Sequence, residues 1–137
     1  MSEHIFALLV HERAEPFDLL KRTLRDLSVE TYSVKTCKEA EDLITHCKPH
    51  IIFTDSAVSD GSWVSISNLS EQADVPASII VVGSVPNTKL YLSVMERGAF
   101  DFIAPPFEHE PMKFVVRSAA LNAYQRRERT AQAACAN

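Results

Sequence analysis

One acidic residue, Asp55, ends an apolar stretch within the segment IIFTDSAVSDGSW (residues 51–63). A carboxylate at the tip of a buried strand is in an unfavourable place for a charge unless chemistry happens there. Asp55 could therefore be a reactive group, a metal ligand, or a strand-end residue that is simply exposed to water. His11 and Glu12, which follow the apolar run HIFALLV, are the other candidates for a site of this kind.

The elements that would position these residues follow from the hydrophobic pattern. Short apolar or β-branched runs predict five strands, at 4–10, 31–34, 51–54, 78–82 and 100–103. Amphipathic stretches predict a helix after each strand, beginning near Pro16, near 38, at an N-cap Ser62, at an N-cap Asn87 or Thr88, and near Glu108. This alternation predicts an α/β fold with a doubly wound parallel sheet. The carboxyl ends of the first, third and fourth strands should then meet at one crevice.

Composition limits the function classes. The chain has 137 residues, of which 46% are hydrophobic and 23% charged, as expected for one globular domain. No apolar run is long enough to span a bilayer, no signal peptide is evident, and three cysteines without a CxxC pair indicate neither a disulfide framework nor a zinc site. These features favour a cytoplasmic protein without a membrane partner, and the net charge of -4 argues against direct nucleic-acid binding.

The segment around Asp55 and the segment ERGAFDFIAPPF (96–107) resemble the receiver domains of bacterial two-component response regulators. The resemblance covers roughly residues 4–125, and the spacing of Asp55, Gly83 and Gly98 agrees with it. It implies a flavodoxin-like (βα)5 sheet of five parallel strands in the order 2-1-3-4-5. It also implies a receiver-like domain at 1–125, with a C-terminal helix end and tail at 126–137. No second globular domain follows, so we expect either a single-domain regulator or a receiver cut from a longer protein.

By this resemblance Asp55 is the candidate phosphoacceptor, and it needs Mg²⁺ and a histidine kinase. The supporting positions depart from the family pattern. The positions of the acidic pair hold His11 and Glu12, and the position of the metal-binding carbonyl holds Ala57. The hydroxyl position holds Gly83, which is followed by Ser84. The lysine position holds Pro105, and the position of the aromatic switch holds Phe102. An imidazole is a poor Mg²⁺ ligand, glycine has no hydroxyl and proline carries no charge, so we expect Mg²⁺ binding to be weak or absent.

These departures favour a non-enzymatic, receiver-like signalling module that acts mainly through protein contacts. The alternative is a working phosphoacceptor that takes a phosphoryl group from a histidine kinase onto Asp55. A small-molecule binder of flavodoxin type gains little support, because three glycines provide no phosphate-binding loop. His11, Glu12 and Asp55 could instead bind a transition metal, although an exposed imidazole near carboxylates more often forms a hydrogen-bonded pair with a raised pKa.

The resemblance also locates a partner surface, on the fourth helix, fifth strand and fifth helix. We expect it to form a symmetric homodimer, with Tyr91 and Met112 as apolar anchors among mixed charges. The family pattern further predicts a cis Pro105–Pro106 peptide bond. We expect Trp63 in the core, and Cys37 and Cys47 as small buried hydrophobic residues.

Overall fold

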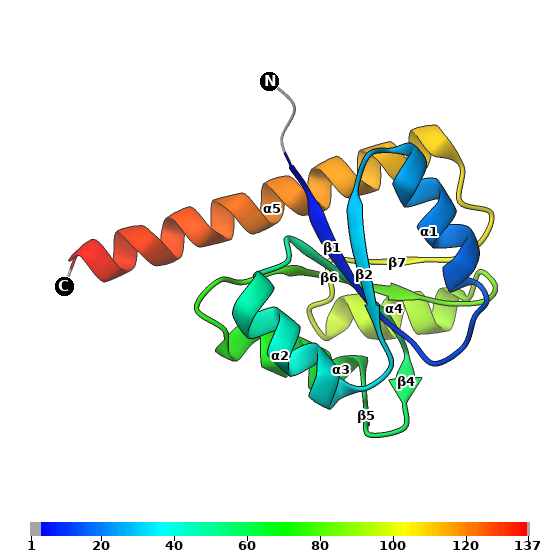
Figure 1. The fold of residues 1–137 in the computed structure, drawn as a ribbon, viewed down its shortest axis with the longest axis horizontal. Helices are drawn as coiled ribbons and strands as arrows, with labels where there is room; N and C mark the ends of the chain where they lie inside the picture. Colours follow the sequence, from blue (N-terminus) through cyan, green and yellow to red (C-terminus); the bar gives the residue numbers. More distant parts are fainter. Residues whose placement is uncertain (1–3, 137) are drawn as a thin grey trace.

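A five-stranded parallel sheet forms the centre of the protein (Figure 1). The computed structural model describes residues 4–136. The sheet strands are β1 (Phe6–Val10), β2 (Glu30–Val34), β3 (Ile51–Asp55), β6 (Ser78–Val82) and β7 (Asp101–Ile103). Their spatial order is β2-β1-β3-β6-β7, which confirms the expected order because β6 and β7 are the fourth and fifth strands of this sheet. The order reverses between β1 and β3, so the ends of these two strands border the crevice.

Five helices cover the two faces of the sheet. They are α1 (Phe17–Asp26), α2 (Cys37–Cys47), α3 (Trp63–Gln72), α4 (Thr88–Glu96) and α5 (His109–Ala136). Buried side chains of α2, α3 and α4 pack on one face, and those of α1 and α5 on the other. The residues of β1 are apolar throughout because both faces of this strand are buried. Leu8 and Val10 point to the face covered by α2, α3 and α4, and Ala7 and Leu9 point to the face covered by α1 and α5.

Helix starts agree with the sequence prediction. The Ser62 side chain accepts a hydrogen bond from Val64 N at the start of α3, and Asn87, rather than Thr88, caps α4 by accepting from Leu90 N. Trp63 is buried, as expected, and its backbone N–H donates to the carbonyl of Ser56, the residue after Asp55. The Pro105–Pro106 bond is cis, as predicted.

Three features differ from expectation. A short antiparallel hairpin, β4 (Ala57–Val58) with β5 (Gly61–Ser62), follows β3 where only a loop was expected. Cys37 is buried, but Cys47 is exposed because it ends α2 on the solvent side. Helix α5 continues to Ala136 and projects well beyond the sheet (Figure 1).

Two arginines hold the middle of this long helix. Arg127 donates to the carbonyl oxygens of Pro76, Lys48 and Pro49 at 3.1, 3.1 and 2.7 Å. Arg126 donates to the Ala77 carbonyl at 3.1 Å. These bonds use carbonyls that lie outside the sheet ladder, so they fix the direction in which α5 leaves the domain. In the described part of the chain, no helix is both long and apolar enough to cross a membrane.

Candidate functional site

Asp55 lies at the carboxyl end of β3 and is buried, with 5% of its surface exposed. The interpretation that it is a strand-end residue exposed to water is therefore wrong. The surrounding chain covers it, and the guanidinium of Arg13 binds it in a bidentate manner. Arg13 Nε donates to Oδ2 at 2.9 Å, and Nη2 donates to Oδ1 at 3.0 Å. Asp55 Oδ1 also accepts from Ser56 N at 2.8 Å, so both carboxylate oxygens are engaged.

Arg13 makes a third contact. Its Nη1 donates to Ser84 Oγ at 2.9 Å, so one side chain links the loop after β1, the end of β3 and the loop after β6. The sequence prediction missed Arg13 and named Ser84 only as the residue that follows Gly83. Because β6 ends at Val82, Ser84 lies in the following loop, where its side chain can reach Arg13. A buried carboxylate at a strand end, with an arginine in a neighbouring loop, is the signal that could have found the pair.

Glu12 contacts the loop after β3 rather than Asp55. Its Oε1 accepts a short hydrogen bond from Ser59 N. In the same hairpin, Asp60 accepts from the backbone N–H groups of Cys37 and Lys38 at 2.7 and 3.1 Å, which lowers its pKa. The acidic residues near the hairpin therefore hold the loop and the start of α2.

His11 is buried, in contrast to the exposed imidazole expected from the sequence. Its ring stacks on Phe17, with the centroids 4.2 Å apart and the planes 4° from parallel. Nδ1 lies 2.6 Å from the Arg13 carbonyl, which can only accept, so Nδ1 carries the proton and Nε2 accepts from Ser33 Oγ at 3.3 Å. Desolvation by burial lowers the pKa of His11, so the expectation of a raised pKa is also wrong.

Gly83 and Phe102 are the residues that the sequence resemblance assigns to the positions of the hydroxyl and the aromatic switch. A Cβ atom placed on Gly83 would lie 2.6 Å from Cζ and 3.0 Å from Cε2 of Phe102. The Phe102 ring therefore fills the space next to residue 83 and is buried there. In this position the aromatic ring points inward, and a side chain larger than hydrogen at residue 83 would collide with it.

The donor set does not fit Mg²⁺ in this conformation. Asp55 is paired with a guanidinium, Glu12 is bound to a backbone N–H and His11 is directed to Ser33 and the Arg13 carbonyl. Among the described residues, no group of three His, Cys, Asp or Glu side chains converges to hold a metal ion. Arg13 supplies at Asp55 the positive charge that a cation would otherwise bring.

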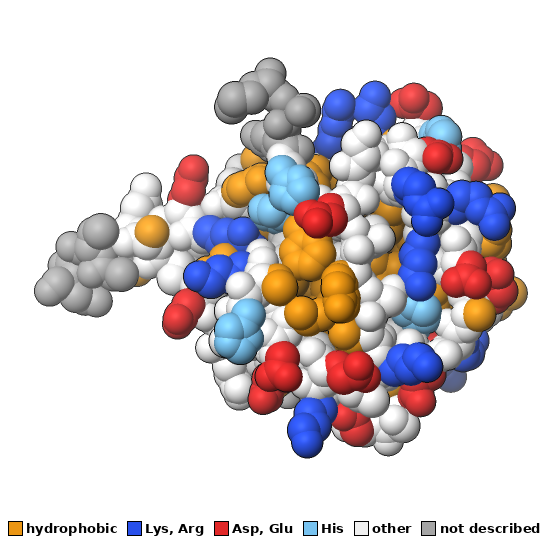
Figure 2. Space-filling model, in the orientation of Figure 1, with side chains coloured by type: hydrophobic (Ala, Val, Ile, Leu, Met, Phe, Trp, Pro, Cys, Tyr) orange, Lys and Arg blue, Asp and Glu red, His pale blue; other side chains and the backbone are white. Residues whose placement is uncertain are grey.

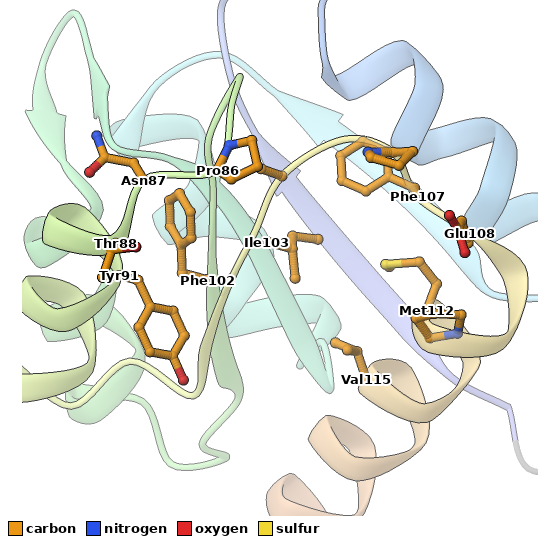
Figure 3. Close-up of a pocket in the computed structure, with 13 residues that line it drawn as sticks. Pro86, Asn87, Thr88, Tyr91, Phe102, Ile103, Phe107, Glu108, Met112 and Val115 are labelled. Carbon is orange, nitrogen blue, oxygen red and sulfur yellow. The ribbon is translucent and has the colours of Figure 1, made fainter.

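A separate apolar hollow of about 420 Å³ lies between α4 and α5 (Figure 3). Asn87, Thr88 and Tyr91 line it on the α4 side, Met112 and Val115 line it on the α5 side, and Phe102 and Ile103 lie between them (Figure 3). Phe102 thus belongs to both regions, since its ring also lies against Gly83. Tyr91 is exposed, as expected of a partner anchor, but Met112 is only 4% exposed, because it packs into the core between α5 and the sheet.

Charges of both signs are interspersed on the face shown in Figure 2. The overall charge is -4. This distribution offers no single-sign field on the visible face that would attract one class of charged partner.

No family model matches the sequence. The chain is similar to the response regulator protein PilR of Pseudomonas aeruginosa, with 24% identity over 113 residues that cover 82% of this chain and 25% of PilR. The chain therefore spans about a quarter of the length of that curated relative.

Solved structures give the same answer for the fold. The signal receiver domain of a protein described as a Luxo repressor, from Vibrio parahaemolyticus, superposes with a TM-score of 0.75 at 24% identity, covering 90% of this chain and 95% of that one. The receiver domain of a sensor histidine kinase from Pseudomonas aeruginosa, solved with magnesium in its active site cleft, superposes with a TM-score of 0.72 at 15% identity. This match covers 86% of this chain and 98% of that one. The resemblance seen in the sequence is confirmed at the level of the fold.

Proposed function

We propose that this chain, which has the fold of a response-regulator receiver domain, acts as a signalling module through protein contacts, with phosphorylation of Asp55 weak or absent. One observation carries the proposal: Arg13 pairs with both oxygens of the Asp55 carboxylate. A nucleophilic carboxylate must present a free oxygen to the phosphoryl group, and here each oxygen already accepts a charge-assisted hydrogen bond.

The same pair disfavours a divalent cation. A guanidinium at hydrogen-bond distance from Asp55 neutralises the carboxylate and repels a second positive charge brought to the same oxygens. The two remaining candidate side-chain ligands are the Glu12 carboxylate, which is hydrogen-bonded to Ser59 N, and the buried His11 imidazole. We therefore propose that Glu12, His11 and the Ala57 carbonyl give at most a weak Mg²⁺ site.

The switch positions support a single conformation. In the family, a hydroxyl drawn towards the phosphate lets the aromatic residue move inward. In this chain Gly83 has no hydroxyl, and Phe102 already occupies the inward position. We propose that the surface built by α4, β7 and α5 is held in one state whatever happens at Asp55, and that it binds a partner directly. That partner is a histidine kinase, another signalling protein or a second copy of the chain.

The alternative, a working phosphoacceptor, has one observation in its favour. The Arg13 side chain is 52% exposed, so it can swing out into solvent and release Asp55. Direct measurement of Mg²⁺ and phosphoryl-analogue binding separates the two functions.

The experiment compares the unaltered protein with Arg13→Ala and Arg13→Lys. Each protein is titrated with Mg²⁺, with and without beryllofluoride, while Trp63 fluorescence is followed. Trp63 is a suitable reporter because its backbone N–H is hydrogen-bonded to Ser56, the residue after Asp55. We expect no saturable response from the unaltered protein or from Arg13→Lys, and a response in Arg13→Ala. Asp55→Asn in the Arg13→Ala background is the control and should abolish it. Tight, Asp55-dependent beryllofluoride binding by the unaltered protein would establish the alternative.

A further inference from the structure

The apolar hollow between α4 and α5 has the size and lining of a small-molecule site. Its volume of about 420 Å³ falls within the roughly 300–1,000 Å³ that is usual for ligand pockets. Aromatic rings and prolines make up much of its wall, namely Tyr91, Phe102, Phe107, Pro86, Pro106 and Pro111. Such a lining favours a ligand with an apolar body.

The walls of the hollow are fixed by the rest of the protein. Phe102 and Met112, which line it, are buried in the two core clusters on opposite faces of the sheet. The start of α4 is held by Asn87, whose side chain accepts a hydrogen bond from Leu90 N at 3.0 Å. The prolines have a fixed φ angle, so the rim between them has little freedom to lose. A ligand therefore meets a preformed surface and does not have to order it.

Polar groups at the rim are not engaged by the protein. Among the residues that line the hollow, Glu108 is the only one with a charged side chain, and it is exposed. In the described part of the chain, its carboxylate takes part in no ion pair within 4.0 Å and in no side-chain hydrogen bond. Within residues 4–136, the hydroxyl groups of Thr88 and Tyr91 also have no hydrogen-bond partner.

These groups are separated along the hollow. Figure 3 shows Phe107 and Glu108 at one end and Thr88 and Tyr91 at the other, with Phe102 between them. A carboxylate attracts a positive group through charge, and an aromatic ring close to it adds a cation–π attraction. The arrangement therefore suits a molecule with a positive group at one end and an apolar body at the other.

We propose that the hollow binds a small organic cation, an ammonium group carried on an aromatic or short alkyl body. The ammonium group lies at Glu108, and the body lies against Phe102 and Tyr91. An anionic ligand would meet the Glu108 carboxylate, and a wholly apolar ligand would leave that carboxylate unused. The inference goes beyond the proposed function, because it does not depend on Asp55. It adds to that function a ligand that would compete with a protein partner for the α4–β7–α5 surface.

Two probes that differ in charge test the site. 2-Phenylethylamine and 3-phenylpropionate share a phenyl ring and a short chain, but the first is a cation and the second an anion. Each is titrated into the isotope-labelled full chain while the backbone amide resonances are followed. We expect the amine to cause saturable shifts confined to residues 87–91 and 102–115, and the acid to bind at least about tenfold more weakly.

Matched variants then locate the two ends of the ligand. Glu108→Gln should weaken amine binding by about threefold to fivefold, whereas Glu110→Gln removes an exposed carboxylate outside the hollow and should leave it unchanged. Tyr91→Ala should weaken amine binding by about tenfold, because it removes an aromatic wall. Phe114→Ala is its control, since Phe114 is an exposed ring that does not line the hollow.

Three results would overturn the proposal. They are equal binding of the two probes, equal effects of the Glu108 and Glu110 substitutions, and no saturable shift below about 10 mM amine. The last result is also the one expected if another protein chain covers the hollow. Circular dichroism checks that every variant is folded. Failure of this site leaves the proposed function standing, because that function is decided separately by beryllofluoride binding at Asp55.

Discussion

At the scale of single residues, Arg13 is the charged partner of Asp55. A buried carboxylate is stable when its charge is matched by a partner and its lone pairs accept hydrogen bonds, and Arg13 and Ser56 N together meet both needs. Because Arg13 also reaches Ser84, the pair connects the loop after β1, the end of β3 and the loop after β6.

The free energy of unfolding should reveal this pairing in a double-mutant cycle. Arg13→Ala should destabilise the protein by about 1–3 kcal/mol, because it leaves a buried carboxylate short of donors. In the Asp55→Asn background, the same arginine substitution should cost much less, since the amide carries no charge to compensate. Urea unfolding of the four proteins measures the coupling. Additive effects would show that Arg13 contributes nothing through Asp55.

His11 predicts how stability depends on pH. Burial lowers its pKa, so the unfolded chain takes up a proton at a higher pH than the native protein does. The contribution of His11 is complete above the unfolded value of about 6.5 and is lost as pH falls through the lowered native pKa. The groups that act on the ring are Arg13 through its carbonyl, Lys21, Asp18 and Asp55.

The test is urea unfolding between about pH 5 and pH 8, comparing the unaltered protein with His11→Gln. We expect the glutamine variant to lose stability less steeply below about pH 6.5, because it has no imidazole to protonate. Equal pH slopes in the two proteins would contradict a buried, neutral His11.

Sequence reasoning placed the candidate residues at one edge of the sheet but did not find the contacts between them. Asp55, Glu12, Gly83 and Phe102 could be placed because strand ends and family spacing fix their positions. The role of Arg13 could not be predicted, because its long and flexible side chain can point either to solvent or inward. Only the packed structure shows which. Burial of His11 was missed for a related reason, because its stacking partner Phe17 lies in the next element.

At the scale of secondary-structure elements, β6 and β7 are interlocked at Gly83 and Phe102. The two strands are paired in parallel, and Gly83 N donates to the Ile103 carbonyl at 2.9 Å just beyond the end of β6. The ring of Phe102 fills the volume left by the missing side chain. This contact connects the end of the sheet nearest Asp55 with the hollow between α4 and α5.

Gly83→Ala should therefore be costly, although alanine is the smallest change available. The new Cβ would approach Phe102 Cζ to 2.6 Å, and we expect a loss of about 1–3 kcal/mol from overpacking, with the ring displaced towards the hollow. Phe102→Leu removes the two ring atoms concerned, so the double variant should be more stable than the sum of the single effects predicts. Thermal unfolding of the single and double variants measures this coupling. Strictly additive effects on stability would show that residue 83 and Phe102 are not packed against each other.

Elements were predicted more completely than their ends. Continuous apolar runs and helix caps such as Ser62 are strong local patterns, so the five sheet strands and all five helices were found. The β4–β5 hairpin has two residues in each strand, too few for a periodic pattern. The length of α5 was underestimated because contacts distant in sequence, from Arg126 and Arg127 to the carbonyls of Ala77 and Pro76, support it there.

At the scale of the whole molecule, the Asp55 region and the α4–β7–α5 surface are joined by packed contacts. Arg13 links Asp55 to Ser84, Ser84 follows Gly83, and Gly83 lies against Phe102, which lines the hollow. Allosteric coupling requires an element with two arrangements that both sites bias. Here the Phe102 ring fills the space beside Gly83, which has no hydroxyl, so we propose that the partner surface keeps one arrangement.

Association should therefore be independent of Asp55. Asp55→Ala removes the candidate phosphoacceptor and releases Arg13, but it leaves the Gly83–Phe102 contact in place, so the dissociation constant of any homodimer should change by less than about twofold. Arg117→Glu should weaken the dimer at low salt, and raising the salt to about 0.5 M should reduce the difference between this variant and the unaltered protein. Sedimentation of the three proteins, each with and without Mg²⁺ and beryllofluoride, makes the comparison. Loss of association in Asp55→Ala, or a gain in the unaltered protein on adding beryllofluoride, would show instead that phosphorylation of Asp55 controls this surface.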